Sequence, residues 1–294
     1  MQKIVSYGKI VFFVIAWVFV GIFLYKNWFS LTALLSVRNW FYFVLSFLFL
    51  LPAYYALYLA RKNLINAFHM KIPEHRQWSI FAHSMITRYI PGGIWNHVDS
   101  ALQMREHGAP VKQTGKLVFL ELYWRTVFGY IFFGIIIFTS DAARSLFGVF
   151  GYVLFLISLV IIGVVTVGVG YIKPRFRLNS WRVLGEQSIF ELFYYVFTGL
   201  SFVFLVAAFQ NFNFSLLSIY YVIAASAIGW IAGFLFLPAP SGLGIREVVM
   251  AYFLSGIGPI FAVGFSLVLL SRIVMLVRDV AIYTGSLLLT KLHK

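Results

Sequence analysis

Long apolar runs dominate this sequence and leave few folds open to it. Of its 294 residues, 62% are hydrophobic and only 11% are charged, whereas a soluble domain carries about 25% charged residues. A helix needs about 20 apolar residues to cross a membrane. The runs lie approximately at 10–25, 41–60, 117–139, 146–170, 189–210, 216–237, 248–270 and 272–290. We therefore expect an all-α polytopic membrane protein with about eight transmembrane helices, forming one integral membrane domain over residues 1–294.

The basic residues indicate how such a domain is oriented. The net charge is +14, and the charges gather between the second and third runs, between the fourth and fifth, and after the last. Cytoplasmic loops carry this excess of lysine and arginine, so eight spans with both termini cytoplasmic fit the pattern. A basic surface also attracts anionic lipid headgroups. Because the charges do not form a nucleic-acid stripe, we expect no nucleic-acid partner.

Two segments interrupt the apolar pattern with proline and glycine beside charged residues. The first is Arg88-Tyr-Ile-Pro-Gly-Gly-Ile-Trp-Asn96, and the second is Leu237-Pro-Ala-Pro-Ser-Gly-Leu-Gly-Ile-Arg-Glu247. Irregular backbone survives in a membrane only where protein or a wet cavity covers it, and transporters build substrate sites at such broken helices. A pair of interfacial loops is the alternative. Because there are two such breaks and each contains an arginine, we favour a substrate site over interfacial loops.

Neither break fits a complete span. The stretch 77–90 is about five residues too short to cross a bilayer, and Pro91-Gly-Gly then ends it. We expect a re-entrant hairpin over 77–107; an amphipathic helix in the interface is the alternative. Around 238–259 we also expect a re-entrant or broken helix. Ser255-Gly-Ile-Gly-Pro259 interrupts the seventh run, so this run can form two half-helices.

Charged residues inside the predicted spans need partners. Glu121 and Arg125 lie four residues apart and so share one helix face, and each buried charge costs about 3 kcal/mol on insertion scales. We expect the two either to neutralise each other or to face a polar interior, as a structural ion pair that ties helices together or as a headgroup or proton-coupling site. Glu191 is expected near a helix start, where the helix dipole favours a carboxylate.

The arginines suggest an anion as the ligand. Arg246 and Glu247 follow the second break at a helix start, where free N–H groups can hold an anion. Guanidinium groups bind phosphate in a bidentate manner and stay charged in a low dielectric. A phospholipid or isoprenoid phosphate is therefore the expected guest. The candidate substrate-binding residues are Arg88, Pro91, Gly92, Gly93, Asn96, Glu121, Arg125, Gly242, Gly244, Arg246, Glu247, Arg272, Arg278 and Asp279.

Enzyme signatures are lacking in the sequence. His83, His97 and Asp99 lie close together, but no paired-carboxylate or histidine-rich metal pattern and no phosphate-binding loop is present. The chain has no cysteine, which excludes disulfides and thiolate metal sites. We expect no catalytic residue, no metal site and no cofactor.

At these residues the chain resembles the lysylphosphatidylglycerol synthase/flippase transmembrane-domain family of bacteria and archaea. The resemblance covers nearly the whole chain. It is carried by Arg88-Tyr-Ile-Pro-Gly-Gly93, the stretch through Arg105-Glu-His-Gly108, the region from Glu121 to Arg125, and the more specific Pro240-Ser-Gly-Leu-Gly-Ile-Arg-Glu247. The sequence ends at Lys294 without the aminoacyl-transferase domain that fused members carry, so the resemblance implies lipid translocation, not lipid synthesis, in a bacterial or archaeal cytoplasmic membrane.

Two functions remain open on the sequence. The first is a flippase-like transporter that moves an anionic or modified phospholipid, or a lipid-linked phosphate, between leaflets. The second is a non-transporting accessory protein that binds or presents a lipid to an envelope-biosynthesis enzyme. A third, an intramembrane enzyme acting on a lipid phosphate, needs a nucleophile or metal cluster that the sequence does not offer.

Overall fold

Five long helices form the body of the protein. The computed structural model describes residues 25, 37–89, 95–139, 152, 156, 159–160, 181–235, 242, 244–256 and 261–292. Five helices in this part of the chain are long and apolar enough to cross a membrane. They are α3 (Trp40–Ala67), α6 (Val111–Thr139), α8 (Trp181–Phe209), α9 (Leu216–Leu235) and α11 (Phe261–Leu292).

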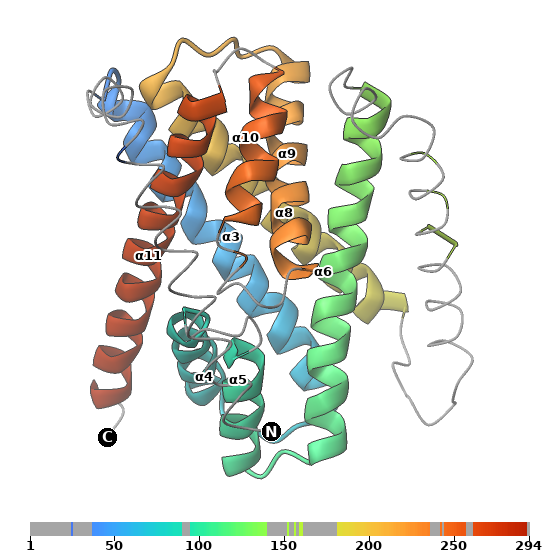
Figure 1. Ribbon diagram of the computed structural model, residues 1–294. Coiled ribbons are helices and arrows are strands. Elements are labelled where there is room, and N and C mark those ends of the chain that lie inside the picture. Colours follow the sequence, from blue (N-terminus) through green and yellow to red (C-terminus); the bar gives the residue numbers. More distant parts are fainter. Residues whose placement is uncertain are drawn as a thin grey trace, which may run out of the picture.

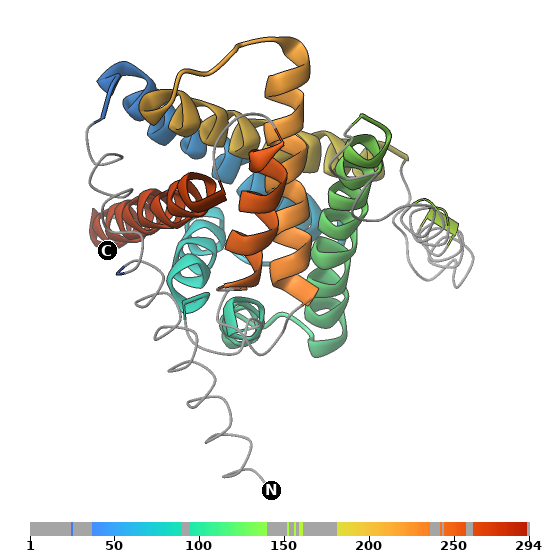
Figure 2. The ribbon, with the colours of Figure 1, turned by 45° about the horizontal axis from the view of Figure 1, so that its top comes forward.

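Three shorter helices lie beside the breaks that the sequence marks. Helix α4 (Glu74–Thr87) ends just before Pro91-Gly-Gly, and α5 (Trp95–Glu106) begins after it. Helix α10 (Ile245–Ser255) begins at the second break. Helices α4 and α5 pack together at one end of the bundle, whereas α9 and α10 pack together at the other (Figure 1). In both views α9 and α10 lie between α6 and α11 (Figures 1 and 2).

The predicted runs and the helices agree in part. Runs 41–60, 117–139, 189–210 and 216–237 lie largely within α3, α6, α8 and α9, while 10–25 and 146–170 fall almost wholly outside the described residues. The seventh run, 248–270, is not one helix: α10 ends at Ser255, and residues 261–270 begin α11, which continues through the eighth run. The glycines and Pro259 between them explain the division, because proline lacks the N–H that a helix interior needs.

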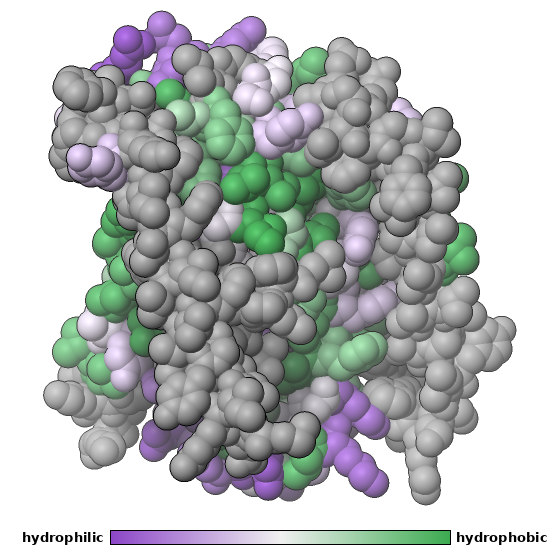
Figure 3. Space-filling view, in the orientation of Figure 1, coloured by the Kyte–Doolittle hydropathy of each residue, from purple (hydrophilic) through white to green (hydrophobic). Residues whose placement is uncertain are grey.

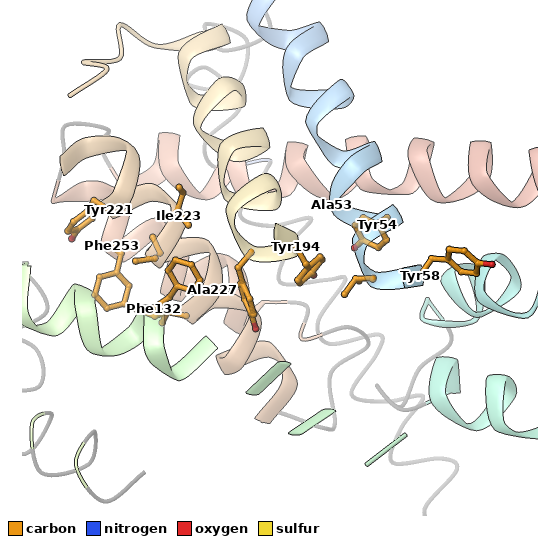
Figure 4. Packing of buried hydrophobic residues seen from close by; sticks show 14 of the residues in the cluster. Ala53, Tyr54, Tyr58, Phe132, Tyr194, Tyr221, Ile223, Ala227 and Phe253 are labelled. Atoms are coloured by element: carbon orange, nitrogen blue, oxygen red, sulfur yellow. The ribbon is translucent and has the colours of Figure 1, made fainter. Parts of the chain in front are cut away.

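Close packing of small residues joins the central helices. A Cβ added at Gly199 of α8 would lie 2.6 Å from the side chain of Ile223 in α9, and the hydroxyl of Ser201 donates to the carbonyl oxygen of Ser46 in α3 at 2.7 Å. Such residues let membrane helices approach closely. The main hydrophobic cluster is rich in aromatic rings, including Tyr54 and Tyr194 (Figure 4).

The outer surface matches a membrane environment. On the face seen in Figure 3, hydrophilic residues gather toward the two ends, and hydrophobic residues lie between them. Large apolar side chains also point outward from α11, where Val277 is 54% exposed and Val280 is 46% exposed. A soluble monomer rarely exposes a contiguous apolar patch of large size. These features are those of a multi-pass, all-helical membrane protein.

Candidate functional site

A cavity is lined by described residues that flank both helix breaks. Its volume is about 110 Å³, which is enough room for several water molecules. Arg88 and Asn96 reach it from the two sides of the first break, and Gly242 and Arg246 reach it from the second. Sequence segments about 150 residues apart therefore meet at one polar space within a bundle of apolar helices. The remaining lining residues are Tyr54, Leu57, Tyr89, His97, Arg125, Tyr194, Trp230, Gly233, Phe234, Arg272 and Met275.

Glycines allow the second break to reach this cavity. Gly242 has φ +67°, and a Cβ there would lie 2.2 Å from the Cα of Gly233 in α9, so only glycine fits this approach of backbone to backbone. Gly244 precedes α10 with φ +93°. Its N–H donates to a carboxylate oxygen of Glu247 at 2.6 Å, which satisfies a backbone donor that the helix start would leave unpaired.

Arg246 enters the cavity from the first turn of α10. Its buried Nε atom has no hydrogen-bond partner among the described residues, and no carboxylate of the described chain forms an ion pair with it. The neighbouring carboxylate, Glu247, is instead paired with Arg272 of α11 and is fully buried. A guanidinium without a counter-ion in a partly buried space is suited to receive an anion.

Arg88 approaches the cavity from the C-terminal end of α4. It donates to the hydroxyl of Tyr54 at 2.9 Å and lies 4.0 Å from a carboxylate oxygen of Asp279. The same carboxylate accepts from Tyr89 at 2.8 Å and from Arg278 at 2.6 Å. Two arginines and a tyrosine thus share Asp279, which lies fully buried in α11.

Arg125 forms a third side of the cavity. Its guanidinium pairs with the buried carboxylate of Glu191 in α8 at 3.3 Å and lies over the rings of Tyr194 and Trp230, with 5.3 and 5.9 Å to the ring centres. Aromatic faces attract a cation. Glu191 lies ten residues inside α8, so our interpretation of it as a carboxylate at a helix start is wrong.

Glu121 pairs with a different arginine from the one expected. Its carboxylate binds Arg61 of α3 in a bidentate manner, at 2.6 and 3.0 Å, and Arg61 also donates to Ser100 at 2.9 Å. Of the two arrangements expected, the direct pair with Arg125 does not form; each residue instead pairs with an opposite charge in the interior, which α3 and α8 bring to α6. Parallel donor and acceptor pairs give this fork geometry its strength.

Two histidines on α4 and α5 have different surroundings. His97 lies 3.9 Å from Glu121, and burial lowers its pKa to about 4, so its ring is neutral at pH 7. His83 lies outside the cavity; its Nδ1 is 2.8 Å from Asp99, and both also contact Gln103. Within the described ranges no group of three or more histidine, aspartate or glutamate side chains has the arrangement of a metal site.

The structure brings together six of the candidate residues and separates others. Arg88, Asn96, Arg125, Gly242, Arg246 and Arg272 line the cavity. Glu247, Arg278 and Asp279 form ion pairs behind it, whereas Glu121 and Gly244 are not among its lining residues. Pro91, Gly92 and Gly93 lie outside the described residues.

Sequence reasoning missed several residues of this network. Arg61 looked like a loop charge because it follows an apolar run, yet it is 5% exposed. Tyr54, Tyr194 and Trp230 were indistinguishable from other aromatic residues in apolar segments. The one feature of the sequence that indicated an interior charge network was the number of arginines in or beside the predicted spans, which is larger than the number of carboxylates there.

Comparison of the chain with protein-family models, with curated proteins and with solved structures found no match.

Proposed function

We propose that this protein is a flippase-like lipid transporter whose cavity binds the phosphate of an anionic or modified phospholipid, or of a lipid-linked phosphate. One observation carries the proposal. Arg88, Arg125, Arg246 and Arg272, from four separate helical elements, converge on one cavity inside a bundle of apolar helices. Guanidinium groups bind phosphate oxygens through paired hydrogen bonds, and acyl chains would remain in the surrounding bilayer.

The arrangement of the short helices supports transport. We infer that the α4–α5 pair enters the membrane from one face and the α9–α10 pair from the other, as broken helices do in transporters. Their facing ends carry Arg88 and Arg246, which line the same cavity. Unaided flipping is slow because a charged headgroup must cross hydrocarbon, and a polar site at that depth lowers the cost.

The proposal also includes an orientation. In Figure 1, α3 and α11 end at the side of the bundle that holds α4 and α5. The exposed basic residues of that side would make it cytoplasmic by the positive-inside rule. With α11 ending on that side, the C-terminal end of the described chain is cytoplasmic in this proposal, and the basic residues of the sequence favour the same side for the N-terminus. The proposed location is the cytoplasmic membrane of a bacterium or archaeon.

The second candidate is an accessory protein that binds or presents a lipid to an envelope-biosynthesis enzyme. The cavity favours it as well, because a fixed polar site that holds a headgroup is all that binding or presentation requires. The resemblance to the lysylphosphatidylglycerol synthase/flippase transmembrane-domain family favours transport. Neither candidate requires a cofactor or a chemical change in the lipid.

A reconstitution experiment separates the two candidates. Liposomes containing the purified protein and a fluorescent anionic phospholipid are treated with an impermeant quencher, and the rate of exchange between leaflets is measured. We expect the wild type to accelerate exchange and Arg246→Gln to lower the rate by about tenfold or more, the effect of losing roughly 1.4 kcal/mol of stabilisation. Arg105→Gln, which removes an exposed charge on α5, should retain the rate. Copurifying lipid without any acceleration would refute transport and favour the accessory protein.

A further inference from the structure

A second polar space shares residues with the cavity, and serine and threonine hydroxyls supply most of its polar lining. Arg246 and Met275 line both spaces. No carboxylate is among the described residues that line the second space, so an anion that entered it would meet no like charge there. We call this space the hydroxyl pocket; its hydroxyl-bearing residues are Ser46, Thr198, Ser201, Ser226 and Ser271.

The hydroxyl pocket lies nearer than the cavity to the end of the bundle where α3 begins. On α3 the cavity is lined at Tyr54, whereas the pocket is lined at Ser46, about 12 Å closer to the helix start at 1.5 Å per residue. On α8, whose end is hydrogen-bonded to the start of α3, the cavity is lined at Tyr194 and the pocket at Ser201. The α4–α5 pair lies at the opposite end of the bundle (Figure 1). The cavity and the pocket therefore follow one another along the bundle.

Hydroxyls of the pocket are able to take a polar partner. Thr198 is 7% exposed, and its Oγ1 has no hydrogen-bond partner among the described residues. Ser226 and Ser271 donate to carbonyl oxygens one turn back in their own helices, at 2.7 and 2.6 Å. A helix carbonyl also accepts a backbone N–H, so these hydroxyls can turn away without leaving it unpaired. Because a hydroxyl both donates and accepts and rotates to suit its partner, the pocket can bind water or donate to a phosphate oxygen.

Arg246 stands at the junction of the two spaces. Its Nε atom, like Oγ1 of Thr198, has no hydrogen-bond partner in the described part of the chain. Buried polar groups are usually hydrogen-bonded, so two such atoms, one from α10 and one from α8, favour a polar occupant. The five hydroxyl-bearing residues are all 7% exposed or less, whereas the side chain of Arg88 in the cavity is 21% exposed. The pocket is thus the more enclosed of the two spaces.

We propose, resting on the proposed function, that the hydroxyl pocket is the second half of the route by which a phospholipid headgroup crosses the bundle. The phosphate binds first in the cavity. Arg246 stays in contact with it as it enters the pocket, because this side chain lines both spaces. Thr198, Ser226 and Ser271 then donate to the phosphate oxygens in place of water. Since the pocket is enclosed, the helices around it must separate at this step, as they do when a transporter exposes its site to one side at a time.

Paired measurements of binding and of leaflet exchange test this route. Thr198→Val and the double variant Ser226→Ala with Ser271→Ala remove hydroxyls at nearly constant size. Binding of dioctanoyl phosphatidylglycerol in detergent should stay within about threefold of the wild type, because its phosphate binds in the cavity. Exchange of fluorescent phosphatidylglycerol in liposomes should fall by about tenfold. The matched control is Ser266→Ala, which should keep both: Ser266 also lies in α11, is 6% exposed and donates to Ala262 at 2.8 Å, but lines neither space.

Thiol labelling tests the direction of the route without relying on transport. The chain has no cysteine, so a single introduced cysteine reports on its own position. Asn213 is exposed between α8 and α9, at the end of the bundle where α3 begins. With phosphatidylglycerol present, a small impermeant methanethiosulfonate should modify Ser226→Cys from the same side of the membrane as Asn213→Cys, and it should leave Ser266→Cys unmodified. Modification of Ser226→Cys only from the side of Lys71→Cys, or from neither side, would overturn the route.

The two measurements also separate this inference from the proposed function. If the wild type accelerates exchange and the hydroxyl variants match Ser266→Ala, the route is refuted and transport stands. A loss of binding that equals the loss of exchange in the hydroxyl variants would also overturn the route, because it would place these hydroxyls in the first binding step. If the wild type accelerates no exchange, transport is refuted, and labelling of Ser226→Cys alone decides whether a polar route reaches that end of the bundle.

Discussion

The buried pair of Arg61 and Glu121 gives the sharpest test of how the interior charges stabilise the protein. Arg61 donates twice to the carboxylate, at 2.6 and 3.0 Å, and once to Ser100 at 2.9 Å. Arg61 and Glu121 are only 5% and 3% exposed. Removing one partner should therefore leave the other as an uncompensated charge that water cannot reach.

Glu121→Leu alone should lower the free energy of unfolding by about 3 to 5 kcal/mol, the usual cost of breaking a buried pair from one side. The double variant Arg61→Leu with Glu121→Leu should recover most of that loss, because a buried ion pair can be replaced by apolar side chains of similar volume. A residual cost of about 1 kcal/mol is expected from Ser100, whose buried hydroxyl loses this partner.

Equilibrium unfolding in mixed micelles, followed by circular dichroism, measures these differences as a double-mutant cycle. The matched control is the exposed pair of Lys62 and Glu74, whose side chains are 29% and 69% exposed; Glu74→Gln should change the free energy of unfolding by less than about 1 kcal/mol. The reasoning fails if Glu121→Leu costs no more than this control, or if the double variant is less stable than Glu121→Leu.

Three further predictions follow from the backbone, from a buried ring and from the ends of the bundle. Gly242→Ala should lower the thermal unfolding temperature by several degrees, because the added Cβ would overlap the backbone of α9. The control is Gly108→Ala, where φ is +84° but no atom lies within 4 Å of the added Cβ. It should lower the free energy of unfolding only by the roughly 1 to 2 kcal/mol that a left-handed conformation costs. Burial lowers the pKa of His97 to about 4, so as the pH falls below about 6.5 the unfolded chain binds a proton at this residue before the folded chain does. The free energy of unfolding should therefore be full above that pH and decline by about 3 kcal/mol toward pH 4, as thermal unfolding can measure. His97→Gln should remove this part of the dependence of stability on pH. In a chain without cysteine, single cysteines at the exposed positions Lys71 and Asn213 should react with an impermeant thiol reagent from opposite sides of the membrane, and labelling of both from one side would contradict the orientation.

Local sequence rules located the long helices because the requirement for crossing a bilayer is itself local. A sufficient length of apolar residues marks α3, α6, α8 and α9, and proline with glycine marks where α4 and α10 meet irregular backbone. Helix α8 begins earlier than expected, at Trp181, because the first two turns mix polar and apolar residues, which shortens the apolar run, but contain no proline that would stop the helix. That difference moved Glu191 from a helix start into the interior.

The charge network could not be predicted in the same way. Arg61 and Glu121 are 60 residues apart in sequence, and they meet only because α3 and α6 carry them to the same depth in the bundle. The rule for residues four apart on one helix indicated Arg125 as the partner of Glu121 instead. The number of arginines in the predicted spans led us to predict an anion site in general terms. Which of these arginines pair with a carboxylate depends on packing between helices.

The contact of Arg88 with Asp279 has a consequence for the order of biosynthesis. The two residues are separated by 191 positions, and α4 packs against α11. At about 5 to 20 residues per second, a ribosome needs roughly 10 to 40 s to make the intervening chain. Until then, Arg88 has been synthesised without this carboxylate, and the cavity lacks Arg272. The nascent protein thus completes the cavity only when the last described helix docks, so a ribosome stalled before α11 would leave a chain whose cavity lacks Arg272 and whose Arg88 lacks Asp279.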